Sequence, residues 1–180
     1  MAIFVALLLS VSAWQTKDPA QWTGDDVSQI LTDSPWSAPA KLYQSLDSAS
    51  GRPKAVRVTI QWQSALPIRL AMAKKDGSAV DASAAPEEYV VVVSGLTAST
   101  YGLTPRKLKS TISLIRSGHE RVYPSRVDIP DSQTVVFHFP KKDAISLDDK
   151  HVEFQLFTKK IHLNRKFVLK EMQFRGRLEL

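Results

Sequence analysis

The residues best suited to chemistry are four histidines, and their spacing matches no familiar metal or catalytic pattern. No two of them form an HxxxH or HExxH pair, the spacings that place two zinc ligands on one helical face; they are His119, His138, His151 and His162. A connecting loop that folds back could bring His138 and His151 together with Asp148 as a zinc site. The alternative is that these histidines face solvent from strands, and we expect no metal.

Acidic residues gather in Asp143–Lys150, where the sequence reads DAISLDDK. The segment lacks both the ligand spacing and the glycine of a calcium-binding loop, so we expect Asp148 and Asp149 to cap a turn. No GxSxG, SxxK, phosphate-binding loop or GxGxxG pattern occurs in the chain. The sequence therefore predicts no catalytic residue and no cofactor.

Carboxylates that act as a pair can come from distant strands, and spacing along the chain does not reveal them. A hydrolase or carbohydrate-active protein is therefore the alternative function, with a site on the end loops 94–105 and 140–150. Four tryptophans could line a sugar platform: Trp14, Trp22, Trp36 and Trp62. For the last three, core packing is the alternative. Their places beside a helix or on the apolar face of a strand favour core packing instead.

Positive charge is concentrated in the second half of the chain. Residues 14–94 contain 8 Lys and Arg against 9 Asp and Glu, whereas residues 95–180 contain 16 against 9. A charge asymmetry of this kind indicates either an anionic partner or a well-solvated face of a sheet.

Alternation within residues 152–180 places most basic side chains opposite the apolar ones. Candidate contacts for an anionic partner are Lys166, Lys170, Arg175 and Arg177, together with the small-residue loop Asp76–Pro86. The aromatic residues of this region are predicted to point inward, which removes the stacking platform of single-strand binders. We therefore expect an unknown protein or an anionic envelope component as partner, and no nucleic acid.

The first residues resemble a signal peptide. Ala2–Val11 is an uncharged apolar run that is too short to span a bilayer, and Val11-Ser12-Ala13 supplies small residues for cleavage after Ala13. No Lys or Arg precedes the run, so a buried N-terminal strand or helix is the alternative. We expect export to the periplasm or the extracellular space, with no transmembrane span in the mature form.

The chain contains no cysteine. Disulfides, cysteine-ligated metals, a thiol nucleophile and a lipid-modified cysteine are therefore excluded for this sequence. Export without disulfides suits a bacterial protein better than a small eukaryotic secreted domain.

A short helix is expected after Thr23, which can cap it together with Asp26, and its apolar stripe is Val27, Ile30 and Leu31. Ser34-Pro35 ends the helix, and Trp36 anchors its exit. We expect a second short helix after Pro39 and a third from Pro67, the latter with Leu66, Leu70 and Ala73 on one side. Residues 14–54 would form a helical lead packed on the body.

Alternating or continuous apolar runs predict strands through the rest of the chain. They cover 55–63, 87–94, 108–116, 121–129, 134–139, 152–156, 161–169 and 174–178. The run 121–129 contains Pro124 and should lie at a sheet edge. This pattern predicts a mainly β protein: an antiparallel β-sandwich of about seven to eight strands in residues 55–180, with one to three short helices.

The segments KDPAQWTGDDVSQILTDSPW, VRVTIQWQSALPIRLAM and the C-terminal KFVLKEMQFRGRLEL carry a resemblance to a known group. They resemble short exported bacterial proteins of unknown function, in which a WTxDD helix ends in SPW and the tail reads KFxLKxMxFxGxLEL. The resemblance implies a secreted or envelope-associated domain and transfers no catalytic or ligand residue. With the absent catalytic patterns, it favours a non-catalytic binding or envelope-associated module.

Overall fold

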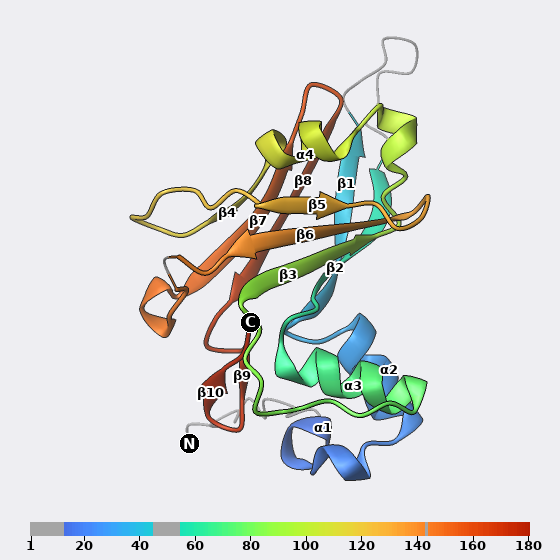
Figure 1. Ribbon diagram of the computed structural model, residues 1–180, viewed down its shortest axis with the longest axis vertical. Helices are drawn as coiled ribbons and strands as arrows, with labels where there is room; N and C mark the ends of the chain where they lie inside the picture. Colours follow the sequence, from blue (N-terminus) through green and yellow to red (C-terminus); the bar gives the residue numbers. More distant parts are fainter. Residues whose placement is uncertain (1–12, 45–54, 143) are drawn as a thin grey trace, which may run out of the picture.

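The computed structural model of the chain describes residues 13–44, 55–142 and 144–180 (Figure 1). The strands are β1 (Ser37–Gln44), β2 (Ala55–Trp62), β3 (Glu88–Ser94), β4 (Ile112–Ile115), β5 (Arg126–Asp128), β6 (Thr134–Pro140), β7 (His151–Phe157), β8 (Ile161–Val168), β9 (Gln173–Phe174) and β10 (Arg177–Leu178). The α-helices are α1 (Ala13–Thr16), α2 (Gly24–Thr32), α3 (Leu66–Asp76) and α4 (Pro105–Thr111), with short 3₁₀ turns η1 (Pro19–Gln21), η2 (Ala98–Tyr101) and η3 (Leu147–Asp149). The predicted mainly β class is confirmed.

Eight strands form one antiparallel sheet in the order β4-β7-β8-β1-β2-β3-β6-β5, and β9 pairs with β10 in a separate two-stranded sheet. The sheet edges, β4 and β5, are its two shortest strands. Short edge strands limit pairing with other chains. The expected edge position of the proline-interrupted run is confirmed by β5.

The large sheet curls so that its two halves face each other across the core. Phe137 on β6 packs against Phe154 on β7 with ring centroids 5.6 Å apart, although four strands, β8, β1, β2 and β3, lie between β7 and β6 in the sheet order. Figure 1 shows β3, β5 and β6 crossing in front of β7 and β8. Aromatic contacts of this kind contribute beyond their buried area and close the core from both sides.

Helix α2 forms as its sequence predicts. The Thr23 hydroxyl accepts from the backbone N–H of Asp26, and the Asp26 carboxylate accepts from the backbone N–H of Thr23, which is a complete capping box. Val27 and Ile30 are buried on its inner face, and the helix ends before Ser34. Trp36 then enters the core with no exposed surface, as expected.

The helix expected after Pro39 is wrong, because Ser37–Gln44 is the strand β1 in the middle of the sheet. Ala38 and Leu42 are buried while Pro39, Lys41 and Tyr43 are exposed, which is the period of a strand. Seven residue pairs join β1 to β2. The segment expected as a helical lead thus also contributes a central strand.

Three smaller expectations need correction. Residues 105–111 are helix α4 and only 112–115 are strand, because Thr104 caps the Lys107 N–H and Pro105 suits a first turn. Helix α3 is confirmed, but its innermost residues are Ile68 and Ala71, not Leu66 and Leu70. The expected strand 174–178 is instead a hairpin.

That hairpin turns at Arg175 and Gly176, which have φ of 52° and 76°. Two consecutive residues with positive φ form the tight two-residue turn whose twist matches an antiparallel ribbon. The turn therefore pairs Phe174 with Arg177 across its base.

The predicted signal peptide falls on residues 1–13, of which 1–12 lie outside the described residues. Trp14 is 1% exposed, and its ring packs against Trp36 with centroids 5.6 Å apart. Among the described helices, none combines the length and the apolar composition needed to cross a membrane.

Replacing Phe154 with Ala should lower the free energy of unfolding by about 3–5 kcal/mol, because it removes a fully buried ring between the halves of the sheet. Urea denaturation measures the change. Phe157→Ala is the matched control on the same strand, since its side chain is 59% exposed, and it should cost less than about 1 kcal/mol. Equal losses in the two variants would contradict the described closure of the core.

Candidate functional site

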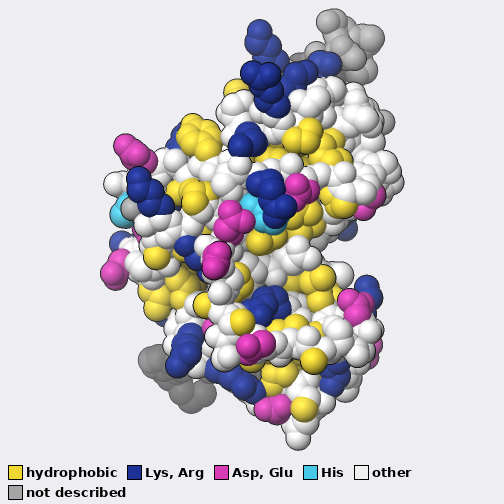
Figure 2. All heavy atoms as spheres, viewed as in Figure 1, with side chains coloured by type: hydrophobic (Ala, Val, Ile, Leu, Met, Phe, Trp, Pro, Cys, Tyr) yellow, Lys and Arg dark blue, Asp and Glu magenta, His cyan; other side chains and the backbone are white. Residues whose placement is uncertain are grey.

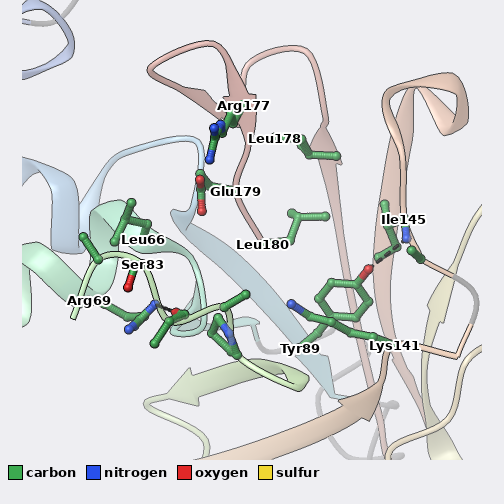
Figure 3. A pocket seen from close by; sticks show the side chains of 15 residues that line it. Leu66, Arg69, Ser83, Tyr89, Lys141, Ile145, Arg177, Leu178, Glu179 and Leu180 are labelled. Atoms are coloured by element: carbon green, nitrogen blue, oxygen red, sulfur yellow. Dashed lines mark hydrogen bonds between the residues drawn. The ribbon is translucent and has the colours of Figure 1, made fainter. Parts of the chain in front are cut away.

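A cleft of about 370 Å³ lies between α3, the segment 82–86, the C-terminal segment 177–180 and the residues Lys141, Ala144 and Ile145 (Figure 3). Figure 2 shows the surface indented between the sheet and the helices α2 and α3, with charged side chains on both sides. Three cations and one carboxylate line the cleft: Arg69, Lys141, Arg177 and Glu179. Leu66, Ile145, Leu178 and Leu180 supply apolar lining.

Glu179 of the C-terminal segment lines the cleft and lies beside the N-terminus of α3. Ala65 precedes the helix and gives it no side-chain cap, while the Glu179 carboxylate accepts a hydrogen bond from the backbone of Leu66. A carboxylate at this position also faces the positive end of the helix dipole. The backbone C=O of Glu179 accepts from Trp36 Nε1 at 2.7 Å, which fixes the segment from its other side.

Arg69 builds one wall of the cleft. Its guanidinium donates to the carbonyl oxygens of Asp81 at 2.9 Å and Ala84 at 2.8 Å. Asp81 in turn accepts from the backbone N–H and the hydroxyl of Ser83. Arg69 therefore holds the exposed small-residue loop against α3, and this loop forms a wall of the cleft.

Lys141 reaches into the cleft over an aromatic ring. Its Nζ lies 4.7 Å from the centre of the Tyr89 ring, and the Tyr89 hydroxyl oxygen accepts from the Ile145 backbone N–H at 2.8 Å. Burial lowers the pKa of Lys141 below its ordinary 10.5, with the charge of Arg69 acting in the same direction and that of Glu179 against it.

Burial also raises the pKa of Glu179, against the hydrogen bond from Leu66 and the charges of Arg177, Arg69 and Lys141. For both Lys141 and Glu179, burial removes water that stabilised the charged form, and the neighbouring groups restore only part of that stabilisation. Cleft residues with pKa values displaced by burial are candidates for function. With three cations against one carboxylate, this cleft can accept an anionic group and pack an apolar portion beside it.

The basic residues singled out by sequence do not form one surface. Arg177 lines the cleft, whereas Arg175 lies on the hairpin turn and donates to Asp18 at 2.9 Å. Lys166 is on β8 opposite Glu153, and Lys170 is exposed in the turn that follows β8. The loop Asp76–Pro86, also singled out, contributes residues 82–86 to the cleft wall.

Sequence reasoning missed Arg69, Lys141 and Glu179. They are separated by 72 and 38 residues along the chain, and no periodicity links α3 to the segments after β6 and β10. The prediction that the aromatic residues of the C-terminal region point inward is also wrong at one position, because Phe157 is 59% exposed. Phe157 follows the buried Leu156 on β7, and the alternation of the strand directs it to the exposed face.

His138 is held by two neighbouring acids. His138 Nδ1 lies 3.2 Å from Glu88 and its Nε2 3.1 Å from Asp128, on opposite sides of the ring. Because the two carboxylates are separated by the imidazole, they do not converge on one point. Within the described ranges, no group of three His, Asp or Glu side chains could hold a metal ion.

Asp149 is the best-buried acid of the 140–150 connection. It accepts from the Ser146 backbone N–H as part of a capping box, as expected, and it pairs with Arg116 at 3.4 Å and with His119 at 3.1 Å. A cleft of about 540 Å³ adjoins these residues. In the part of the chain that the structure describes, no serine hydroxyl hydrogen-bonds to His119, so a nucleophile–base pair is not assembled there.

No protein-family model, curated protein or solved structure matches this chain.

The side chain of Lys141 should titrate below 10.5, and Glu179→Gln should lower its pKa further, because the substitution removes the negative charge that favours the ammonium form. Heteronuclear NMR of the lysine side chains measures both values. Asp76→Asn, an exposed acid that does not line the cleft, is the control and should leave the titration of Lys141 unchanged. An ordinary pKa for Lys141, unaffected by Glu179→Gln, would contradict the described cleft.

Proposed function

We propose that the protein is an exported, non-catalytic binding module that holds an amphipathic anion in the cleft between α3 and the C-terminal segment. The observation that carries the proposal is the arrangement of Lys141 and Arg177 beside an apolar lining. The Arg69 guanidinium already donates hydrogen bonds to the carbonyl oxygens of Asp81 and Ala84. Lys141 and Arg177 are therefore the two cations that would receive an oxyanion. The partner class is an anionic envelope component, as the sequence suggests.

The physical reason for binding an anion is the cost of burial at Lys141. Burial disfavours its ammonium group, and an anionic ligand would restore the interaction that water supplied. Leu66, Leu178 and Leu180 lie beside the charged groups and suit a hydrocarbon portion of the ligand. A ligand with a charged head and a short apolar tail uses both kinds of lining.

Export is supported by the apolar run before Ala13 and by the resemblance of the chain to short exported bacterial proteins. Trp14 directly follows the predicted cleavage site and packs against Trp36, so cleavage there would keep every core residue that the structure describes. We expect the exported protein to be periplasmic or extracellular.

Expression in a bacterial host with fractionation should yield a protein that begins at Trp14 in the periplasm or the medium. Intact-mass spectrometry measures the N-terminus. An Ala13→Leu variant is the control, because a large residue at the last position before the predicted site should slow cleavage. Recovery of the unprocessed chain from the cytoplasm alone would reject the export proposal.

Isothermal titration with octyl phosphate should detect binding, whereas octyl glucoside, which has the same tail and no charge, should not bind measurably. Lys141→Gln and Arg177→Gln should each weaken the binding of octyl phosphate by about tenfold, since each removes a charge-assisted contact. Lys142→Gln is the matched control, because this neighbouring lysine is exposed and does not line the cleft.

The affinity for octyl phosphate should also fall as the pH rises through the lowered pKa of Lys141. The anion favours the protonated lysine, so binding is strongest below that pKa and weakens from a pH under 10.5 upward. Equal affinity for the charged and neutral ligands, or an unchanged affinity in Lys141→Gln, would overturn the proposed function.

A further inference from the structure

One end of the molecule is strongly basic and is separate from the cleft. Residues 95–116 and 154–170 contain no Asp or Glu. Figure 2 shows Lys and Arg side chains gathered at the end where α4 and the β7–β8 turn lie. We call this region the basic end; its exposed cations are Arg106, Lys107 and Lys109 on α4 and Lys159 and Lys160 in the turn.

The fold brings the two acid-free stretches together. Ile112, directly after α4, pairs with Leu156 near the end of β7. The turn that carries Lys159 and Lys160 follows one residue after β7 ends, so it lies beside the C-terminus of α4. The charge asymmetry seen in the sequence is therefore concentrated at one end of the structure instead of being spread over a face.

An exposed row of rings crosses the sheet at this end. Phe157 on β7 pairs with His162 on β8, which pairs with Tyr43 on β1. Phe157 is 59% exposed and Tyr43 is 46% exposed, and the rings of Phe157 and His162 lie 4.6 Å apart. Large side chains that stay exposed next to one another mark an interaction surface.

A basic groove opens beside Tyr43, where β1 and β8 separate. Among the described residues, two pairs join these strands, against seven in each of the flanking pairs β1–β2 and β7–β8. The groove has a volume of about 400 Å³, and its lining contains no acid and three cations: Lys41, Arg57 and Arg165.

These three cations have no acidic partner among the described residues, although Arg165 lies 5.9 Å from the centre of the Phe167 ring. Lys41 and Arg57 stand directly opposite each other on β1 and β2, where like charges are destabilising. The Nε of Arg165 is buried without a hydrogen bond. Among the residues that the structure describes, no ion pair involves Lys41, Arg57 or Arg165. The groove therefore has the uncompensated positive charge of a site for an oxyanion.

We propose that the basic end docks on a membrane surface of anionic phospholipid. The lysines of the β7–β8 turn and α4 face the negative surface, Phe157 and Tyr43 enter the headgroup layer, and the groove beside Tyr43 receives a lipid phosphate. Aromatic rings with one wet side suit this layer, and clustered basic residues are attracted to anionic headgroups. This inference uses other residues than the cleft and does not rest on the proposed function.

The ring geometry favours lipid over nucleic acid. The planes of Phe157 and His162 meet at 77°, so the edge of one ring covers the face of the other. Base stacking needs an open ring face, whereas entry into a headgroup layer needs only exposed apolar surface.

Co-sedimentation of the full chain with phosphatidylglycerol vesicles tests the docking, with phosphatidylcholine vesicles as the neutral comparison. The double variant Lys159→Gln/Lys160→Gln should reduce partitioning onto phosphatidylglycerol by about tenfold or more. Lys142→Gln/Lys170→Gln removes the same charge away from the basic end and should change it little. The apolar N-terminal run is common to all variants, so differences between them report on the basic end.

Two further variants separate the parts of the surface. Phe157→Ser should weaken vesicle binding without changing its dependence on salt, whereas Arg57→Gln should weaken it and reduce that dependence, because salt screens charge and not apolar contact. Near-ultraviolet circular dichroism of each variant establishes that the fold is retained.

Binding to phosphatidylglycerol but not phosphatidylcholine, lost in the turn variant and retained in its control, supports the proposal. It is overturned if the protein binds neither vesicle, or if both double variants lose binding equally. Binding to a single-stranded oligonucleotide without binding to vesicles would assign the basic end to nucleic acid and also overturn it.

Discussion

The contact between Trp36 and Glu179 joins segments 143 residues apart, and the geometry of the cleft depends on it. The Trp36 indole donates to the Glu179 backbone, and the Glu179 side chain meets the first turn of α3. One residue of the C-terminal segment is thereby fixed to the N-terminal region through its main chain and to the helix through its carboxylate. Arg177 is placed two residues away by the same link, next to the walls that Arg69 holds.

The arrangement also explains why a charged cleft can persist in a small domain. A half-buried carboxylate at a helix N-terminus can satisfy an otherwise unpaired backbone donor. Glu179 supplies this for α3, whose own preceding residue, Ala65, cannot. The carboxylate thus stabilises the fold while leaving the opposing cations with an excess of positive charge. Glu179 therefore contributes both to the stability of α3 and to the charge distribution of the cleft.

Local patterns in the sequence predicted the elements whose signals are themselves local. The capping box at Thr23, the alternation through β2 and the short proline-interrupted edge strand β5 are all confirmed, because each depends on neighbours within a few residues. Strand β1 was mispredicted since Pro39 and the adjacent Leu42 and Tyr43 suit a helix start equally well, and only pairing with β2 decides between the two. The cleft could not be predicted, because its cations come from segments that meet only after the sheet has curled.

The short ladder between β1 and β8 has a mechanical consequence. Among the described residues, two pairs join β1 to β8, whereas each of these strands has seven pairs on its other side. The described part of the large sheet therefore consists of two well-bonded panels, β4-β7-β8 and β1-β2-β3-β6-β5, joined at a narrow seam. The cost of separating strands grows with the number of ladder bonds that must break, so bending or partial opening concentrates there. Contacts across the core, such as Phe137 on Phe154, also join the two panels. A force or a bound surface applied at the end of the sheet would therefore rotate one panel against the other before it disturbed either panel.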